Sequence, residues 1–236
     1  GVSDVVLTMF ILFVIQLNIF KLTNKMAMKS VLCFGDSNTW GCSPDLPRRY
    51  NRAERWTMLL QSKLPNYVVI EEGLNSRTTV LDDPYEAGKK GLDYLLPCIE
   101  SHHPDLVILM LGTNDLKSRF NLTASDISKG AARLVQLIQN YQHGFMTKPA
   151  EVLLVSPTHV LEVNPLKEGF TNAEAKSKQL GHYFKLRSQE LGCHFFDAAT
   201  EIQPCPKEGI HWQASQHEKF AEILAKRIPT ILETAV

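Results

Sequence analysis

The run that most constrains the fold is DLVILMLG, residues 105–112, because almost every side chain in it is apolar. A strand with one face toward solvent alternates apolar and polar residues, whereas a strand buried on both faces does not. Burial on both faces is typical of strands in a parallel sheet that helices cover from either side. This run therefore predicts a central parallel strand in an α/β protein.

The same pattern recurs along the chain from residue 29 onward. Further short apolar runs predict strands at residues 30–34, 67–72, 151–157 and 193–198. Apolar residues spaced three and four apart predict helices at residues 53–64, 86–101, 125–141, 172–191 and 213–232. We expect Ser125 or Asp126 to cap the third of these helices, and Gly192 to end the fourth. The alternation predicts a single doubly wound α/β domain over residues 29–236.

Length and charge narrow the classes of function. A chain of 236 residues suits one α/β domain with a full core. Lys and Arg number 25 and so do Asp and Glu, so neither nucleic acid nor an anionic membrane is an expected partner. The cysteines are scattered without a C-x-x-C pair, which argues against a metal site or a disulfide framework. They favour a reducing, cytoplasmic compartment, and they are Cys33, Cys42, Cys98, Cys193 and Cys205.

Residues 1–28 form an apolar N-terminal extension that stands outside this pattern. Residues 5–20 are almost all apolar, but they are shorter than the roughly 20 residues that span a bilayer. Neither Lys nor Arg precedes them, and no clear small-residue cleavage site follows. Three interpretations remain open. The segment is upstream or non-native sequence, or a signal or membrane anchor that would permit export or membrane contact, or a helix that packs on the domain or on a neighbouring subunit.

Small and polar residues follow each predicted strand. In doubly wound sheets, functional residues gather at the carboxyl ends of the strands. The segments that reach this edge are Gly35-Asp36-Ser37-Asn38, Gly73-Leu74-Asn75-Ser76, Gly112-Thr113-Asn114-Asp115, Ser156-Pro157-Thr158-His159 and Glu208-Gly209-Ile210-His211. We therefore expect their side chains to converge on one site.

Three of these residues could form a nucleophilic triad. A serine hydroxyl attacks efficiently only when a base, usually histidine, takes its proton. Ser37 and His211 follow different strands at the same edge, so they can meet. Glu208 lies three residues before His211, which lets its carboxylate fold back and hold the imidazole tautomer.

Acyl transfer also places negative charge on an oxygen, which needs fixed hydrogen-bond donors. We expect these donors to be the backbone N–H groups of Ser37 and Gly73 and the side-chain amide of Asn114. Gly73 suits the role because it lacks a Cβ, so its backbone can approach a substrate closely.

Four blocks of this sequence, GDSNTWG, the glycine of EEGLNSRTT, GTND and EGIH, resemble the four conserved blocks of the SGNH (GDSL) hydrolase family in order and spacing. They extend from about residue 30 to the C-terminal region. Within that family, GDSxTWG with EEGLxxRTTxxDDP and GTNDxK is similar to the bacterial arylesterase and acyltransferase branch.

The resemblance implies a flavodoxin-like three-layer α/β/α sandwich with a five-stranded parallel sheet, and ester hydrolysis through an acyl-serine without a cofactor or metal. It also implies Ser37 as nucleophile, His211 as base, and Gly73 and Asn114 as oxyanion donors. The family acid is normally Asp, so Glu208 departs from the pattern, and Asp197 after the fifth strand is the alternative acid.

Several neighbours are expected around the reacting atoms. We expect Trp40, Asn75, Ile210 and His159 to line the substrate pocket, although His159 could instead serve its loop. Asp36 adjoins Ser37, and because adjacent side chains point apart we expect it to support the loop by hydrogen bonds. Lys117 is expected to face solvent, with the pocket entrance as the alternative.

The leading hypothesis is a serine esterase acting on small-molecule aryl or alkyl esters of short, acetyl-like acids, because no insertion is long enough to cover a lipid tail. Acyl transfer to alcohols or peroxide is part of this hypothesis. A carbohydrate or xylan acetylesterase would use the same residues, as would a thioesterase. A non-catalytic binding domain is the alternative from another class, and the sequence leaves homo-oligomer formation open.

Overall fold

The computed structural model describes residues 2–26, 28–142, 148–163 and 167–233. A five-stranded parallel sheet with the order β2-β1-β3-β4-β5 forms its centre. The strands are β1 (Lys29–Gly35), β2 (Tyr67–Gly73), β3 (Leu106–Met110), β4 (Glu151–Ser156) and β5 (His194–Asp197). Every residue of β3 is buried, and the predicted parallel α/β class is confirmed.

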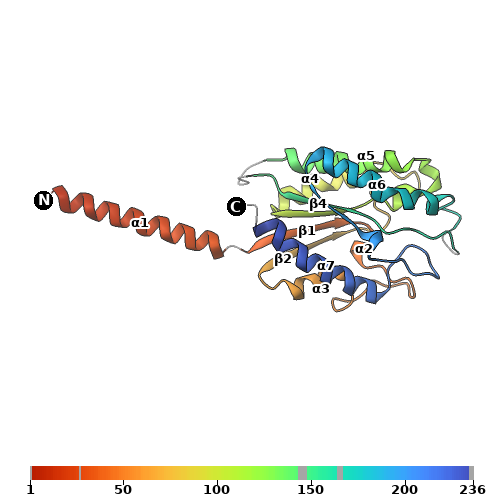
Figure 1. Cartoon of the computed structure of the whole chain (residues 1–236), viewed down its shortest axis with the longest axis horizontal. Coiled ribbons are helices and arrows are strands. Elements are labelled where there is room, and N and C mark those ends of the chain that lie inside the picture. The colour runs from red at the N-terminus through yellow and green to blue at the C-terminus, as the bar shows by residue number, and fades with distance from the viewer. Residues whose placement is uncertain (1, 27, 143–147, 164–166, 234–236) are drawn as a thin grey trace.

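Helices cover both faces of the sheet, which gives three layers (Figure 1). One face packs against α4 (Gly91–His102), α5 (Ala124–Asn140) and α6 (Ala173–Leu191). The other face packs against α3 (Trp56–Lys63) and α7 (Ala214–Glu233). Each face contributes its own cluster of buried apolar side chains, so the sheet separates two cores.

The strand order reverses next to β1, and this places the site. From β1 the chain moves to β2 on one side, then crosses back to β3 on the other side of β1. Connections that leave neighbouring strands in opposite directions open a crevice at their carboxyl ends. The short helix α2 (Ser37–Trp40) follows β1, and the 3-10 helix η1 (Asn114–Leu116) follows β3. Ser37 and Asn114 therefore begin the two segments that flank the crevice.

The observed helices differ from the predicted ones mainly at three starts, and α3 begins at Trp56 instead of residue 53. Helix α4 begins at Gly91 instead of residue 86, because residues 86–88 form a turn with Gly88 at φ +73°. Lys90 then forms a β-bridge with Thr78, whose N–H donates to the Lys89 carbonyl at 2.9 Å. The cap of α5 is Thr123 instead of Ser125 or Asp126. Thr123 and Asp126 form a reciprocal capping box, so Asp126 is the third helical residue. Gly192 ends α6 in the left-handed conformation, as predicted.

The N-terminal extension forms a long helix, α1 (Val2–Met26), that projects away from the sheet (Figure 1). Side chains from Val6 to Ile19 are exposed, so this part of α1 does not pack on the domain. Within the part of the chain that the structure describes, no helix has the length and hydropathy needed to cross a membrane. Residue 27, next to the predicted domain boundary, lies outside the described residues.

Candidate active site

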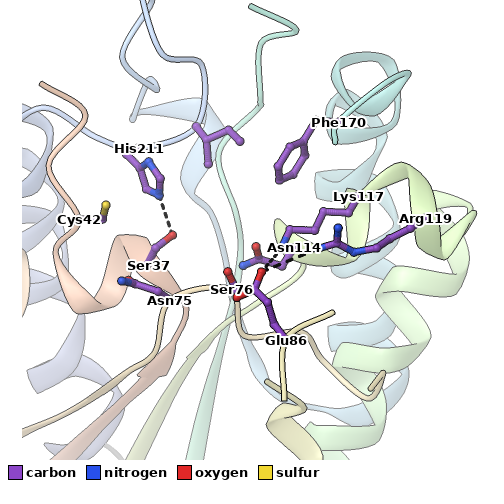
Figure 2. A pocket seen from close by; sticks show the side chains of 11 residues that line it. Ser37, Cys42, Asn75, Ser76, Glu86, Asn114, Lys117, Arg119, Phe170 and His211 are labelled. Carbon is purple, nitrogen blue, oxygen red and sulfur yellow. Dashed lines mark hydrogen bonds and ion pairs between the residues drawn. The ribbon is translucent and has the colours of Figure 1, made fainter. Parts of the chain in front are cut away.

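The three predicted triad residues form a continuous hydrogen-bonded row, and Figure 2 shows the part of it that joins Ser37 to His211. Ser37 Oγ lies 2.9 Å from His211 Nε2, and His211 Nδ1 lies 2.7 Å from Glu208 Oε1. Both distances are those of well-formed hydrogen bonds. The residues follow β1 and β5, as the edge argument requires.

Ser37 is held at the start of α2 by the residues on either side of it. The Asp36 carboxylate accepts a hydrogen bond from the Asn38 N–H at 3.1 Å, and its carbonyl accepts from Trp40 N–H at 2.9 Å. Asp36 therefore supports the turn, as expected, and does not contact the histidine ring. Burial raises the pKa of Asp36 to about 6. This short, capped turn fixes the serine hydroxyl at the crevice.

Gly73 is required for a reason that the sequence did not suggest. A Cβ at Gly73 would lie 2.2 Å from the backbone nitrogen of Trp40 and 2.6 Å from the carbonyl carbon of Thr39. The end of β2 thus presses directly on the backbone of α2, and any side chain would displace the helix that carries Ser37. Gly73 positions the nucleophile whether or not its N–H also contacts substrate.

The loop before His211 explains how glutamate serves where aspartate is usual. Glu208 Oε2 accepts from the N–H groups of Ile210 at 2.9 Å and His211 at 2.7 Å, which leaves Oε1 for the ring. Cys205 N–H donates to the His211 carbonyl at 2.8 Å and closes the loop. Gly209 has φ +93°, and a Cβ there would lie 2.4 Å from the Leu161 carbonyl oxygen. The longer arm of Glu208 is thus folded onto its own turn.

Asp197, the alternative acid, is engaged elsewhere. Its carboxylate accepts from the Ala199 N–H at 3.1 Å and caps the 3-10 helix η3 (Ala198–Thr200). The structure therefore places Glu208, and not Asp197, against the His211 ring.

Asn38 joins the serine segment to the histidine loop, a role that sequence reasoning missed. Its Nδ2 donates to the Ile210 carbonyl at 3.2 Å, and its Oδ1 accepts from the Trp212 N–H at 3.2 Å. These two contacts hold the backbone on both sides of His211. Asn38 is buried, with 3% of its surface exposed, so both hydrogen bonds are shielded from water. The only sequence signal was its position directly after Ser37.

Asn114, the predicted side-chain oxyanion donor, lines the same cavity and is held by one hydrogen bond. Its Nδ2 donates to the Arg77 carbonyl at 3.1 Å. An amide nitrogen carries two hydrogens, so a second donor stays available. The adjacent Asp115 is buried and accepts from the N–H and hydroxyl of Thr79, at 3.1 and 2.5 Å. These contacts fix η1 beneath the cavity.

The charges around the triad favour a basic imidazole. Burial alone would lower the pKa of His211, but the neighbouring Cys42 side chain, the hydrogen bond to Glu208 and the charge of Glu208 outweigh it and raise the pKa. Burial would raise the pKa of Glu208, but its hydrogen bonds from His211 and Ile210 and the His211 charge lower it. The pair therefore stabilises an imidazolium, which is the form that His211 takes after accepting a proton.

Ser37 and His211 open into a cavity of about 390 Å³ (Figure 2). The expected residues Asn75 and Ile210 line it together with Asn114. Ser76, from a segment expected at this edge, lines it too, and sequence reasoning did not place four further residues on its wall: Cys42, Glu86, Arg119 and Phe170. Lys117, expected to face solvent, has only 9% of its side chain exposed and points into the cavity.

Trp40 and His159 are not among the residues that line this cavity, which corrects the expectation for both. Trp40 ends α2, and its ring stacks with the Arg49 guanidinium, whose carbon lies 5.2 Å from the ring centroid. Arg49 Nε also donates to the Trp40 carbonyl at 2.7 Å, which holds the guanidinium beside the ring. His159 lies near the carboxylates of Asp197 and Glu174, which fits the loop role that was its alternative.

A model of the GDSL-like lipase/acylhydrolase family matches residues 33–219 of the chain. The chain is similar to Est24, a carbohydrate acetylesterase from Sinorhizobium meliloti, with 36% identity and a TM-score of 0.82 over 86% of this chain and 99% of that one. It is equally similar to the M. smegmatis aryl esterase, with 36% identity and a TM-score of 0.82 over 86% of this chain and 100% of that one. A second carbohydrate acetylesterase family member from Sinorhizobium meliloti is 32% identical, with a TM-score of 0.84, over 87% of this chain and 100% of that one. No curated protein matches the chain.

Proposed function

Because this chain belongs to the GDSL-like lipase/acylhydrolase family and is a carboxylic ester hydrolase, we propose that it hydrolyses short-chain, acetyl-like esters through an acyl-Ser37 intermediate. The observation that carries the proposal is the row Glu208–His211–Ser37, with hydrogen bonds of 2.7 and 2.9 Å, at the wall of a cavity. The substrates are aryl or alkyl esters of small molecules.

In the first half of the reaction, His211 Nε2 takes the proton from Ser37 Oγ as this oxygen attacks the ester carbonyl carbon. Glu208 keeps the proton of His211 on Nδ1 and stabilises the imidazolium. The carbonyl oxygen becomes negative and accepts hydrogen bonds from Asn114 Nδ2 and the N–H groups of Ser37 and Gly73. The C–O bond to the alcohol then breaks, and His211 returns its proton to the leaving oxygen.

In the second half, a water molecule takes the place of the alcohol. His211 Nε2 removes a proton from this water, the resulting hydroxide attacks the acyl carbon, and the same donors stabilise the negative oxygen. The bond to Ser37 Oγ breaks, and the hydroxyl regains its proton from His211. An alcohol or a peroxide that replaces water would yield acyl transfer or a peracid by the same steps.

The size of the cavity supports a short acyl group. A volume of about 390 Å³ is near the lower end of the range for small-molecule pockets, which is about 300–1,000 Å³. Phe170 and Ile210 supply its large apolar contacts. A long acyl chain would leave most of its surface in water and gain little binding energy.

A carbohydrate acetylesterase is the second candidate. One observation favours it, the polar wall formed by Ser76, Glu86, Lys117 and Arg119, which would contact the hydroxyl groups of a sugar. Two of the similar structures are named as carbohydrate acetylesterases, and another as an aryl esterase.

The decisive experiment compares Ser37→Ala with Ser62→Ala on p-nitrophenyl acetate. Ser62 lies exposed on α3 and hydrogen-bonds only its own helix, so it serves as the matched control. We expect Ser37→Ala to lose on the order of 10⁴-fold or more in kcat/KM and Ser62→Ala to keep its rate. Full activity in Ser37→Ala would refute the proposal.

A series of p-nitrophenyl esters from C2 to C12 then tests the acyl preference. We expect kcat/KM to be highest at the short end and to fall as the chain outgrows the cavity. A maximum at C8 or longer would contradict the short-chain assignment.

A further inference from the structure

The wall across the cavity from the triad carries charged groups that the ester chemistry does not use. Figure 2 shows the side chains of Lys117 and Arg119 pointing toward the Glu86 carboxylate. Asp83, whose side chain is fully buried, lies behind them, with its Oδ2 2.9 Å from Arg119 Nη2. We call Asp83, Glu86, Lys117 and Arg119 the charged wall.

Lys117 is the member of the charged wall with unused donors. Its Nζ lies 3.6 Å from Glu86 Oε1 and 3.8 Å from Asp83 Oδ2, so neither carboxylate is within hydrogen-bond distance. Asp83 already accepts shorter hydrogen bonds from Arg119 at 2.9 Å and from the Tyr85 N–H at 3.0 Å. An ammonium carries three donors, and a nearly buried one needs acceptors. An oxygen atom in the cavity would supply them.

The balance of charge indicates what kind of oxygen fits. Two cations, Lys117 and Arg119, face two carboxylates, Asp83 and Glu86, so the charged wall has no net charge. A further cation, Lys89, lies 3.8 Å from Glu86 but does not line the cavity. An anionic ligand would gain little from Lys117, because it would also meet Glu86. A hydroxyl group both donates and accepts, so it can accept from Lys117 and donate to Glu86. The charged wall therefore favours neutral, hydroxyl-bearing groups.

We propose that Lys117 is a specificity-determining residue whose ammonium donates hydrogen bonds to hydroxyl groups on the alcohol part of the ester. The inference rests on the proposed short-chain esterase function, since a small acyl group fills little of the cavity and leaves the charged wall to the alcohol. Preferred substrates are then acetyl-like esters of polyhydroxylated alcohols.

Two acetate esters of equal carbon number test this inference: glycerol 1-acetate and propyl acetate, which differ by two hydroxyl groups. The readout is the kcat/KM for glycerol 1-acetate divided by the kcat/KM for propyl acetate. Both reactions are measured by titration of the released acetate. We expect the wild-type protein to prefer glycerol 1-acetate beyond the ratio of the two hydroxide-catalysed rates. This arm needs no variant, so it stays informative if a substitution prevents folding.

Lys117→Met removes the ammonium at similar length, and Lys89→Met is its matched control. Lys89 Nζ also lies 3.8 Å from a Glu86 carboxylate oxygen, but Lys89 does not line the cavity. A hydrogen bond to a charged group contributes about 1.5–3 kcal/mol, so we expect the ratio to fall about ten-fold or more in Lys117→Met. In Lys89→Met it should stay within about two-fold. Lys117→Arg, which retains donors, should recover part of the preference.

The inference is overturned if the wild-type ratio shows no preference, or if Lys117→Met and Lys89→Met lower it equally. Its failure is separable from failure of the proposed function. Ser37-dependent hydrolysis of both esters without a hydroxyl preference removes only the role of Lys117. Hydrolysis that survives Ser37→Ala removes the proposed function itself.

Discussion

The two walls of the cavity differ in how closely their polar side chains contact one another. The reactive wall comprises Ser37 and His211 at the cavity, with Glu208 and Asn38 behind them. Its hydrogen bonds measure 2.7 and 2.9 Å within the triad, and 3.2 Å from Asn38 to the backbone on either side of His211. On the charged wall only the pair Arg119–Asp83, at 2.9 Å, is as short, while three other ion pairs measure 3.6, 3.8 and 3.9 Å.

The difference follows from what each wall must do. Proton transfer requires reacting atoms fixed at hydrogen-bond distance, and a displacement of about 1 Å can cost on the order of 10²-fold in rate. Substrate recognition tolerates side chains that adjust to what they bind. The reactive wall should therefore respond steeply to small changes, whereas the charged wall should change selectivity more than rate.

Among the substitutions that test this difference, those of Glu208 should lower kcat/KM most. In Glu208→Gln the carboxylate charge is lost, and we expect kcat/KM with p-nitrophenyl acetate to fall on the order of 10²- to 10⁴-fold. The base must be neutral to act, so activity rises with pH through the pKa of His211. Because Glu208 raises this pKa, the rise should move to lower pH in Glu208→Gln.

Glu201→Gln is the matched control for Glu208, since its carboxylate pairs with Lys219 at 3.1 Å outside the cavity lining. It should leave both rate and profile as they are. Glu208→Asp should fall between wild type and Glu208→Gln, because the shorter arm cannot bond both the ring and the two amides of its turn. Equal activity of Glu208→Gln and wild type would contradict the role of the carboxylate.

Removal of the Asn38 side chain should have the next largest effect, because it releases the histidine loop while leaving all three triad groups in place. We expect Asn38→Ala to lose on the order of 10- to 10²-fold in kcat/KM. It should also lose about 1–3 kcal/mol in the free energy of unfolding, since the Ile210 carbonyl and Trp212 N–H lose their partner. Asn66→Ala, an exposed turn residue, is the control. A rate unchanged by Asn38→Ala would show that the histidine loop holds its position without the two Asn38 hydrogen bonds.

Among the substitutions near the triad, Cys42→Ala should have the smallest effect on kcat/KM. Cys42 lines the cavity, and its side chain is among the causes that raise the pKa of His211. We expect Cys42→Ala to move the acidic limb of the kcat/KM profile to lower pH, with a smaller loss of kcat/KM than Glu208→Gln produces, because Cys42 bonds none of the reacting atoms. A shift to higher pH would contradict this assignment. Cys98→Ala, on the helix α4, should not move the limb.

The reactive wall could be predicted from the sequence because its residues lie close along the chain to recognisable strand ends. Each strand is a short apolar run, and Ser37, Gly73 and Asn114 lie within four residues of a strand end. Glu208 and His211 are three residues apart on one turn. Once a parallel sheet is inferred, these segments can only meet at one edge.

The charged wall and the hydrogen bonds of Asn38 to the histidine loop could not be predicted in this way, because they depend on tertiary packing. Asn38 bonds Ile210, which is 172 residues away in the chain. Glu86 reaches the cavity because residues 86–88 form a turn and Lys90 pairs with Thr78, where apolar spacing predicted a helix. From the sequence alone, Lys117 is expected to face solvent. Only the fold brings Asp83 and Glu86, from another segment, next to it.

The central claim is that Ser37 is an activated nucleophile, and covalent labelling with a fluorophosphonate followed by peptide mass spectrometry tests it most directly. We predict that the wild-type protein carries one phosphonate on Ser37, and that His211→Ala labels far more slowly because the hydroxyl keeps its proton. Ester turnover without label on Ser37, or label on another residue, would contradict the account.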